Sequence, residues 1–117
     1  MAATTQINVG FMAYPLVGGI ENLVSGQLVK TVAATGVPEA ISATSLRVKT
    51  ATVIGRKAER TDNTGTVHVG PTSTDGKQPY DIAAGAIGAV LEHTDLANWY
   101  VDVDNAGDGV VVIYDLE

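Results

Sequence analysis

The chain has 117 residues, a net charge of −6 and no cysteine. This length fits a single domain with one modest core. The lack of cysteine excludes a disulfide framework, a thiolate metal site and a thiol nucleophile. No window reaches the ~18 consecutive apolar residues of a membrane-spanning helix, so we expect no membrane partner.

The charges are unevenly distributed along the chain. Residues 1–80 contain all seven Lys and Arg residues and five Asp and Glu residues, whereas residues 81–117 contain eight Asp and Glu residues and no Lys or Arg. This acidic part either serves solubility or complements a basic patch on a neighbouring subunit. Net acidity disfavours nucleic-acid binding, because phosphate contacts need clustered cations. No basic residue precedes Lys30, which argues against a secretory signal peptide.

Residues 1–26 form an apolar stretch without a helical period, in which Glu21 is the only charged residue. Pro15 and the Gly18-Gly19 pair interrupt any helix, so we expect an extended N-terminal arm. The arm either pairs as the first strand of its own sheet or lies on a partner subunit, where its backbone groups find hydrogen bonds. The candidate partner-interface residues are its larger apolar side chains: Phe11, Tyr14, Leu16, Val17 and Ile20.

Residues 27–117 are expected to form one β-sandwich domain. Its first part contains predicted strands at 27–33, 39–43 and 45–54. In the last of these, the longest β-prone run, Leu46 and Val48 share one face, whereas Ala51 and Val53 have the opposite parity. This change of parity predicts either a β-bulge or two separate strand pieces.

A turn and a short strand occupy the middle of the domain. Asn63 and Gly65 supply the turn, because both tolerate a positive φ angle. In the strand that follows, Val67 and Val69 point to one face and His68 to the other, the period of two expected of a half-buried strand.

The second half of the domain continues the pattern of short strands and turns. Asp95 and Thr94 are placed to cap one helical turn over residues 96–98. The run Val110–Tyr114 is apolar enough to aggregate at an exposed edge, so it must be a central strand or be covered by another chain. The remaining predicted elements are a polar loop at 71–79, strands at 80–82, 87–91 and 99–103, and a turn at 104–109. This spacing predicts an all-β sandwich or jelly roll.

Four segments carry a resemblance to a family of small phage virion proteins. They are Asn63-Thr-Gly-Thr-Val-His-Val-Gly70, Tyr80-Asp-Ile-Ala-Ala-Gly85, Asp95-Leu-Ala-Asn-Trp-Tyr-Val-Asp102 and Ala106-Gly-Asp-Gly-Val-Val-Val-Ile-Tyr114. The resemblance covers about residues 45–116. It implies a β-sandwich displayed on a virus particle as a head decoration (cement) protein, a head fibre or a tail component. It also implies a homo-oligomer, with a trimer fitting the three-fold positions of a capsid lattice.

No residue pattern indicates a cofactor or a metal ion. Asp102, Asp104 and Asp108 resemble a calcium loop, but the fifth and twelfth positions counted from Asp102, which must supply ligands, hold Ala106 and Ile113. We therefore expect a hairpin turn whose Asx and Gly residues serve the backbone.

The remaining candidates for chemistry are few. His68 and His93, the only histidines, are expected to be an exposed strand residue and a loop residue. Trp99 is expected to anchor the core. No nucleophile elbow and no phosphate-binding loop is present, so nothing in the residues supports an enzyme.

The resemblance therefore implies a non-enzymatic virion protein that is assembled in the host cytoplasm. Its most favoured role is capsid decoration, in which it binds the lattice of the major capsid protein or another virion protein and stabilises the head. The alternative is a receptor- or carbohydrate-binding sandwich of a tail or fibre. An exposed aromatic platform near Tyr80, Trp99 or Tyr100 would favour the alternative.

Overall fold

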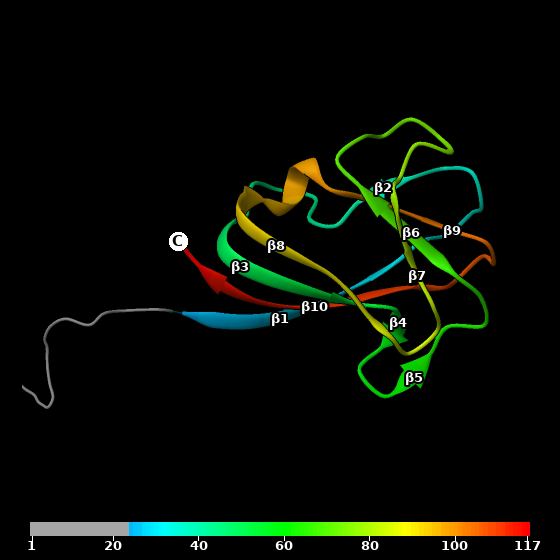
Figure 1. Cartoon of the computed structure of the whole chain (residues 1–117), viewed down its shortest axis with the longest axis horizontal. Helices are drawn as coiled ribbons and strands as arrows, with labels where there is room; N and C mark the ends of the chain where they lie inside the picture. The colour runs from blue at the N-terminus through cyan, green and yellow to red at the C-terminus, as the bar shows by residue number, and fades with distance from the viewer. Residues whose placement is uncertain (1–23) are drawn as a thin grey trace, which may run out of the picture.

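The computed structural model describes residues 24–117, which form two packed four-stranded sheets and a small hairpin (Figure 1). The first sheet has the order β1-β10-β3-β8, and its strands are β1 (Ser25–Thr31), β10 (Gly109–Leu116), β3 (Arg47–Ile54) and β8 (Ile87–Asp95). The second sheet has the order β2-β9-β6-β7, and its strands are β2 (Glu39–Ala40), β9 (Tyr100–Val103), β6 (Val67–Gly70) and β7 (Tyr80–Ile82). The hairpin pairs β4 (Arg56–Ala58) with β5 (Thr61–Asp62). This architecture confirms the predicted all-β, sandwich-like fold.

The hydrophobic core lies between the two sheets. The first sheet contributes Val48, Ala51, Val53, Ala89, Leu91, Val110 and Val112, and the second contributes Val67, Val69, Ile82, Val101 and Val103. Alternate residues of each strand point inward, which is the pattern that aligned sheets require. Burying each valine or leucine contributes about 1.5–3 kcal/mol.

The central position of β10 confirms the expectation for Val110–Tyr114. β10 pairs antiparallel with β1 on one side and with β3 on the other. Val110 and Val112 are fully buried, so neither the backbone nor this part of the strand is available for edge-to-edge aggregation.

The predicted irregularity in β3 is a bulge at Lys49. Asp115 of β10 pairs with Thr50, but the next residue, Leu116, pairs with Val48. Lys49 therefore has no opposite residue on β10, and the bulge lets both Val48 and Ala51 face the core.

Two sequence expectations about local backbone are wrong. His93 does not lie in a loop; it lies near the end of β8, with a φ of 48°. Asn63 and Gly65 do not take a positive φ. Asn63 instead turns its side chain inward, and Gly65 makes room, because a Cβ there would lie 2.8 Å from Nδ2 of Asn105.

Other local predictions are confirmed. The single turn of 3-10 helix, η1 (Leu96–Asn98), begins after Asp95, whose side chain accepts a hydrogen bond from the Ala97 backbone N–H. Gly107 supplies the positive φ of the turn between β9 and β10. Within residues 24–117 no helix is long and apolar enough to cross a membrane.

Candidate functional site

The outer face of the second sheet carries a row of polar side chains centred on His68. The β6 strand places Val67 and Val69 in the core, so His68 between them points outward. Antiparallel register sets Asp81 of β7 on one side of His68 and Asp102 of β9 on the other. The register thus brings together residues that are far apart in the sequence.

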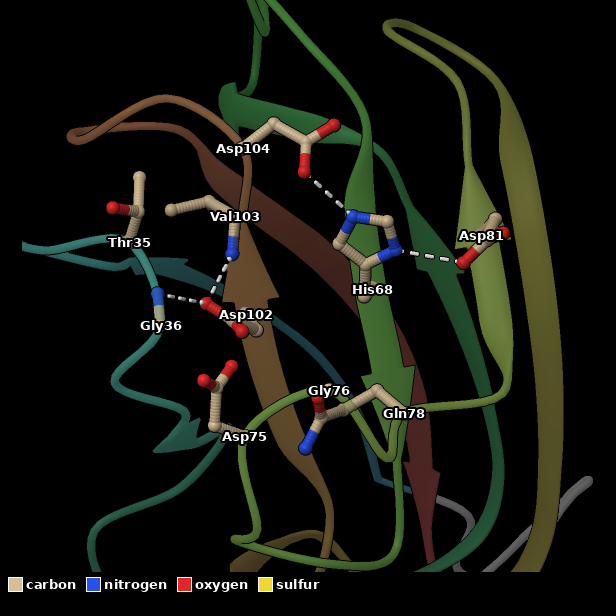
Figure 2. Close-up of a pocket in the computed structure, with 10 residues that line it drawn as sticks. All are labelled: Thr35, Gly36, His68, Asp75, Gly76, Gln78, Asp81, Asp102, Val103 and Asp104. Carbon is tan, nitrogen blue, oxygen red and sulfur yellow. Dashed lines mark hydrogen bonds and ion pairs between the residues drawn. The ribbon is translucent and has the colours of Figure 1, made fainter.

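His68 bridges two carboxylates (Figure 2). Its Nδ1 lies 2.7 Å from Oδ1 of Asp81, and its Nε2 lies 2.9 Å from Oδ1 of Asp104. A carboxylate accepts hydrogen bonds, so both contacts are satisfied together when the ring carries a proton on each nitrogen. Burial lowers the pKa of His68, but the hydrogen bonds to Asp104 and Asp81 outweigh it and leave the pKa above its ordinary value.

Asp102 ties the loop after β1 to the second sheet. Its side chain is buried, and its Oδ1 accepts hydrogen bonds from the backbone N–H groups of Gly36, at 2.9 Å, and Val103, at 2.8 Å. Gly36 has a φ of 74°, and the carboxylate of Asp75 lies close to the place where a Cβ would be. Two carboxylates, one from strand β9 and one from the loop between β6 and β7, therefore converge on Gly36.

These residues border an open hollow of about 540 Å³. Its lining contains Thr35, Gly36, His68, Asp75, Gly76, Gln78, Asp81, Asp102, Val103 and Asp104. Four aspartates and no Lys or Arg line it, so its potential is negative and attracts cations.

In the part of the chain that the structure describes, no hydroxyl group of the lining forms a hydrogen bond with His68. Thr35 is the only hydroxyl residue of the lining. Both nitrogens of His68 are already occupied by carboxylates, so neither is free to take a proton from a nucleophile. Among residues 24–117, no group of three or more histidines or acidic residues is arranged to hold a metal ion. The absence of a cofactor stays a prediction.

The three aspartates of the calcium-like pattern, Asp102, Asp104 and Asp108, have three different roles. Asp108 is buried and accepts hydrogen bonds from the backbone N–H groups of Thr64 and Gly65 and from the Thr64 hydroxyl. This confirms that the carboxylate serves the backbone. Asp104 instead contacts His68, and Asp102 holds the loop at Gly36.

A second feature of this region is an aromatic pair. The ring centroids of Tyr80 and Trp99 are 6.3 Å apart, with the ring planes inclined at 36°. Trp99 packs against the core, but it is only half-buried, and its Nε1 donates to Oγ1 of Thr94. Tyr80 is 45% exposed, whereas Tyr100 is half-buried.

The most apolar exposed surface lies elsewhere, on the outer face of the first sheet. Ile87 is 70% exposed, Val90 61%, Ile113 48% and Val29 38%. These side chains come from β1, β10 and β8, so the surface crosses the whole sheet. The interface candidates chosen from the sequence, Phe11, Tyr14, Leu16, Val17 and Ile20, lie outside the described residues.

Comparison of the chain with family models, with curated proteins and with solved structures finds no match.

Sequence reasoning missed the pairing of His68 with Asp81 and Asp104. The signal for Asp81 is the pair of patterns Val-His-Val in β6 and Tyr-Asp-Ile in β7. Each centres one polar residue between two apolar ones, so two such strands side by side align their polar residues on the outer face. Asp104, in the turn after β9, carries no such signal.

Proposed function

We propose that the chain is a non-enzymatic structural protein of a virus particle, most specifically a capsid decoration protein that binds the lattice of the major capsid protein and stabilises the head. The observation that carries this proposal is the exposed apolar surface on the first sheet. Such a surface on a small domain marks a protein–protein contact. Its residues come from regular strands, which present a rigid surface to a partner.

The charge distribution supports the same role. The outer face of the second sheet is acidic around Asp81, Asp102 and Asp104. The outer face of the first sheet is apolar, with Arg56 and Arg60 beside it. Two opposite faces with different chemistry suit a protein that contacts other subunits on one side and solvent or a second protein on the other.

The motifs described above add the virion context. The segments from Asn63 to Tyr114 resemble small phage virion proteins, and they form β6, β7, β9 and β10 in the structure. The proposal places the protein in the virion as a homo-oligomer, after assembly in the host cytoplasm.

The test is quantitative mass spectrometry of purified particles of the virus that encodes the chain. We expect a copy number in fixed ratio to the major capsid protein, and we expect particles without the chain to lose their contents at a lower temperature. Recombinant protein added to such particles should restore the wild-type temperature. Absence of the chain from purified particles would contradict the proposal.

The aromatic pair favours a second candidate, a carbohydrate-binding module of a tail or fibre. Tyr80 and Trp99 offer a partly exposed pair of rings at the start of β7 and just before β9. Exposed aromatic rings can stack on the apolar faces of sugars. Binding in a glycan array that Tyr80→Ala abolishes, and that Tyr100→Ala does not, would support this candidate over decoration.

A further inference from the structure

The outer face of the first sheet consists of rows that the pairing of its four strands aligns, with register shifts between Val53 and Ile54 against β8 and between Asp115 and Leu116 against β3. One row, the first apolar row, contains Val29, Val111, Ile54 and Ile87, taken from β1 to β8. The next, the second apolar row, contains Gln27, Ile113, Thr52 and Val90. The third row contains Ser25, Asp115, Thr50 and Glu92. The first row is apolar, although its Val111 is buried; the second is apolar at Ile113 and Val90 and polar at Gln27 and Thr52; the third is polar, with Asp115 and Glu92 as its acidic residues.

The opposite end of the same face is basic. Beyond the first apolar row, the hairpin of β4 and β5 carries Arg56, Glu59 and Arg60, which border a hollow on this face together with Ile54, Ile87 and Ile113. Arg56 forms an ion pair with Asp62, so the positive charge that this end offers to a partner is that of Arg60. Arg60 takes part in no ion pair within residues 24–117, and the same holds for Asp115. The face thus changes from basic through apolar to acidic along the strands.

We propose that this face binds the same face of a second copy of the chain, in a dimer with a two-fold axis that lies in the interface and runs across the strands. This axis reverses the strand direction in the partner. The first apolar row then lies over the partner's second apolar row, and the basic end lies over the partner's acidic row. A two-fold interface needs such self-complementarity, because each patch meets a copy of itself.

The charges distinguish this arrangement from the other face-to-face dimer, in which the two-fold axis runs along the strands. A two-fold axis along the strands would place Arg60 over a second Arg60 and Asp115 over a second Asp115. Like charges at short range oppose association, whereas the crosswise axis pairs Arg60 with Asp115 in both directions. Sheets pack face to face at about 10 Å, a distance that Ile, Val and Thr side chains fill.

The inner face of this sheet cannot serve, because it already packs on the second sheet. The second sheet's outer face is equally unsuitable for a self-contact, because its centre is acidic. The outer face of the first sheet is therefore the described surface that combines exposed apolar area with opposite charges at its two ends. The dimer uses the same apolar surface that supports the proposed capsid contact, so one copy cannot make both contacts with this surface at once.

The first experiment measures molar mass by light scattering and sedimentation at 5–100 µM, which is about the range where a small apolar interface associates. We expect a dimer for the full chain. Val90→Asp should weaken dimerisation about 100-fold, because it buries an unpaired charge twice. Val37→Asp is the control, because Val37 is 56% exposed and lies in the loop between β1 and β2, away from the face. A monomer, or a trimer as the resemblance implies, would overturn the proposal.

The second experiment reverses charges. Arg60→Glu and Asp115→Lys should each raise the dimer dissociation constant about fivefold or more, and the double variant should return it to within about threefold of the wild type. Asp115 also accepts hydrogen bonds from Ser25 and Thr50, so circular dichroism must first show that the variants are folded. Additive losses in folded double variants would refute the pairing.

The third experiment tests the direction of the axis and needs no destabilising change. The chain has no cysteine, so Ile87→Cys and Val90→Cys each introduce a single thiol. Ile87 of one copy lies over Val90 of the other in the proposed dimer. Mixing the two variants under mild oxidation should therefore give mixed disulfide dimers faster than either variant gives homodimers. Equal rates for all three products would rule out this arrangement.

Discussion

Asn63 and Gly109 exchange two hydrogen bonds: the Asn63 side-chain N–H donates to the Gly109 carbonyl at 2.8 Å, and the Gly109 N–H donates to the Asn63 side-chain oxygen at 2.9 Å. Asn63 precedes β6 of the second sheet, and Gly109 begins β10 of the first. The side-chain amide of Asn63 thus makes the pair of backbone hydrogen bonds that a neighbouring strand would make, and it links the two sheets at one end of the core.

We expect Asn63→Ala to lower the free energy of unfolding by about 2–4 kcal/mol, because it leaves a buried N–H and a buried C=O of Gly109 without partners. Urea unfolding measures the change. Asn105→Ala is the matched control, because Asn105 is exposed and its amide contacts only the Thr64 hydroxyl. A loss below about 0.5 kcal/mol for Asn63→Ala would show that water replaces the amide.

We expect Asp108→Asn to destabilise the fold by about 1–2 kcal/mol. The substitution keeps the shape but removes the charge that strengthens the hydrogen bonds from the Thr64 and Gly65 backbone. Thermal unfolding at constant ionic strength measures the effect, and Asp75→Asn, at an exposed position, is the control. The same assay with added calcium tests whether the turn of the wild type binds this ion. We expect no change in thermal stability, and a large rise that is specific to calcium would show that the turn is a calcium site.

The stability should depend on pH through His68. Its pKa in the folded protein is raised above the ordinary 6.5 despite the opposing effect of burial. A group with a raised folded pKa binds its proton more tightly when folded, so its contribution is fully present below about pH 6 and is lost as pH rises through the folded pKa. The difference in unfolding free energy between wild type and His68→Gln should therefore shrink from pH 6 towards pH 9.

Two measurements check the His68 prediction. Urea unfolding of both proteins across this pH range gives the difference directly, and NMR titration of the imidazole gives the folded pKa. His93→Gln is the control, because the His93 side chain is 68% exposed. Its Nδ1 lies 3.6 Å from Oε2 of Glu117, which is farther than either carboxylate contact of His68. If the difference in unfolding free energy grew with pH, the neutral imidazole of His68, and not the protonated one, would be the form that stabilises the fold.

Deletion of residues 2–20 should leave a folded β-domain, because both described sheets and their core lie within residues 24–117. If the arm and its candidates Phe11, Tyr14, Leu16, Val17 and Ile20 contact other virion subunits, the deletion weakens capsid binding. Co-sedimentation with particles measures this. The face-to-face dimer should persist in the same variant. Unchanged binding to particles would make the arm dispensable.

The sequence predicted features that depend on neighbours along the chain. Strand alternation located β6, the apolar run Val110–Tyr114 located β10, the Asp95 cap located η1, and the change of parity after Val48 located the bulge. It could not predict features that depend on which strands lie side by side. His68 meets Asp81 and Asp104 only because β6 lies between β7 and β9. The rows of the apolar face likewise depend on the register of four strands from distant parts of the chain.

The central place of β10 has a consequence for synthesis on the ribosome. β1 and β3 do not pair with each other in the first sheet; each pairs with β10, whose residues are made about 55–90 positions later. Until residue 116 has left the ribosome, both earlier strands have an edge that β10 will later fill, and the valines between the sheets lack part of their packing. The domain must therefore complete its fold after nearly all of it has been translated, and a chain halted before β10 would present open strand edges to chaperones and to other unfinished copies.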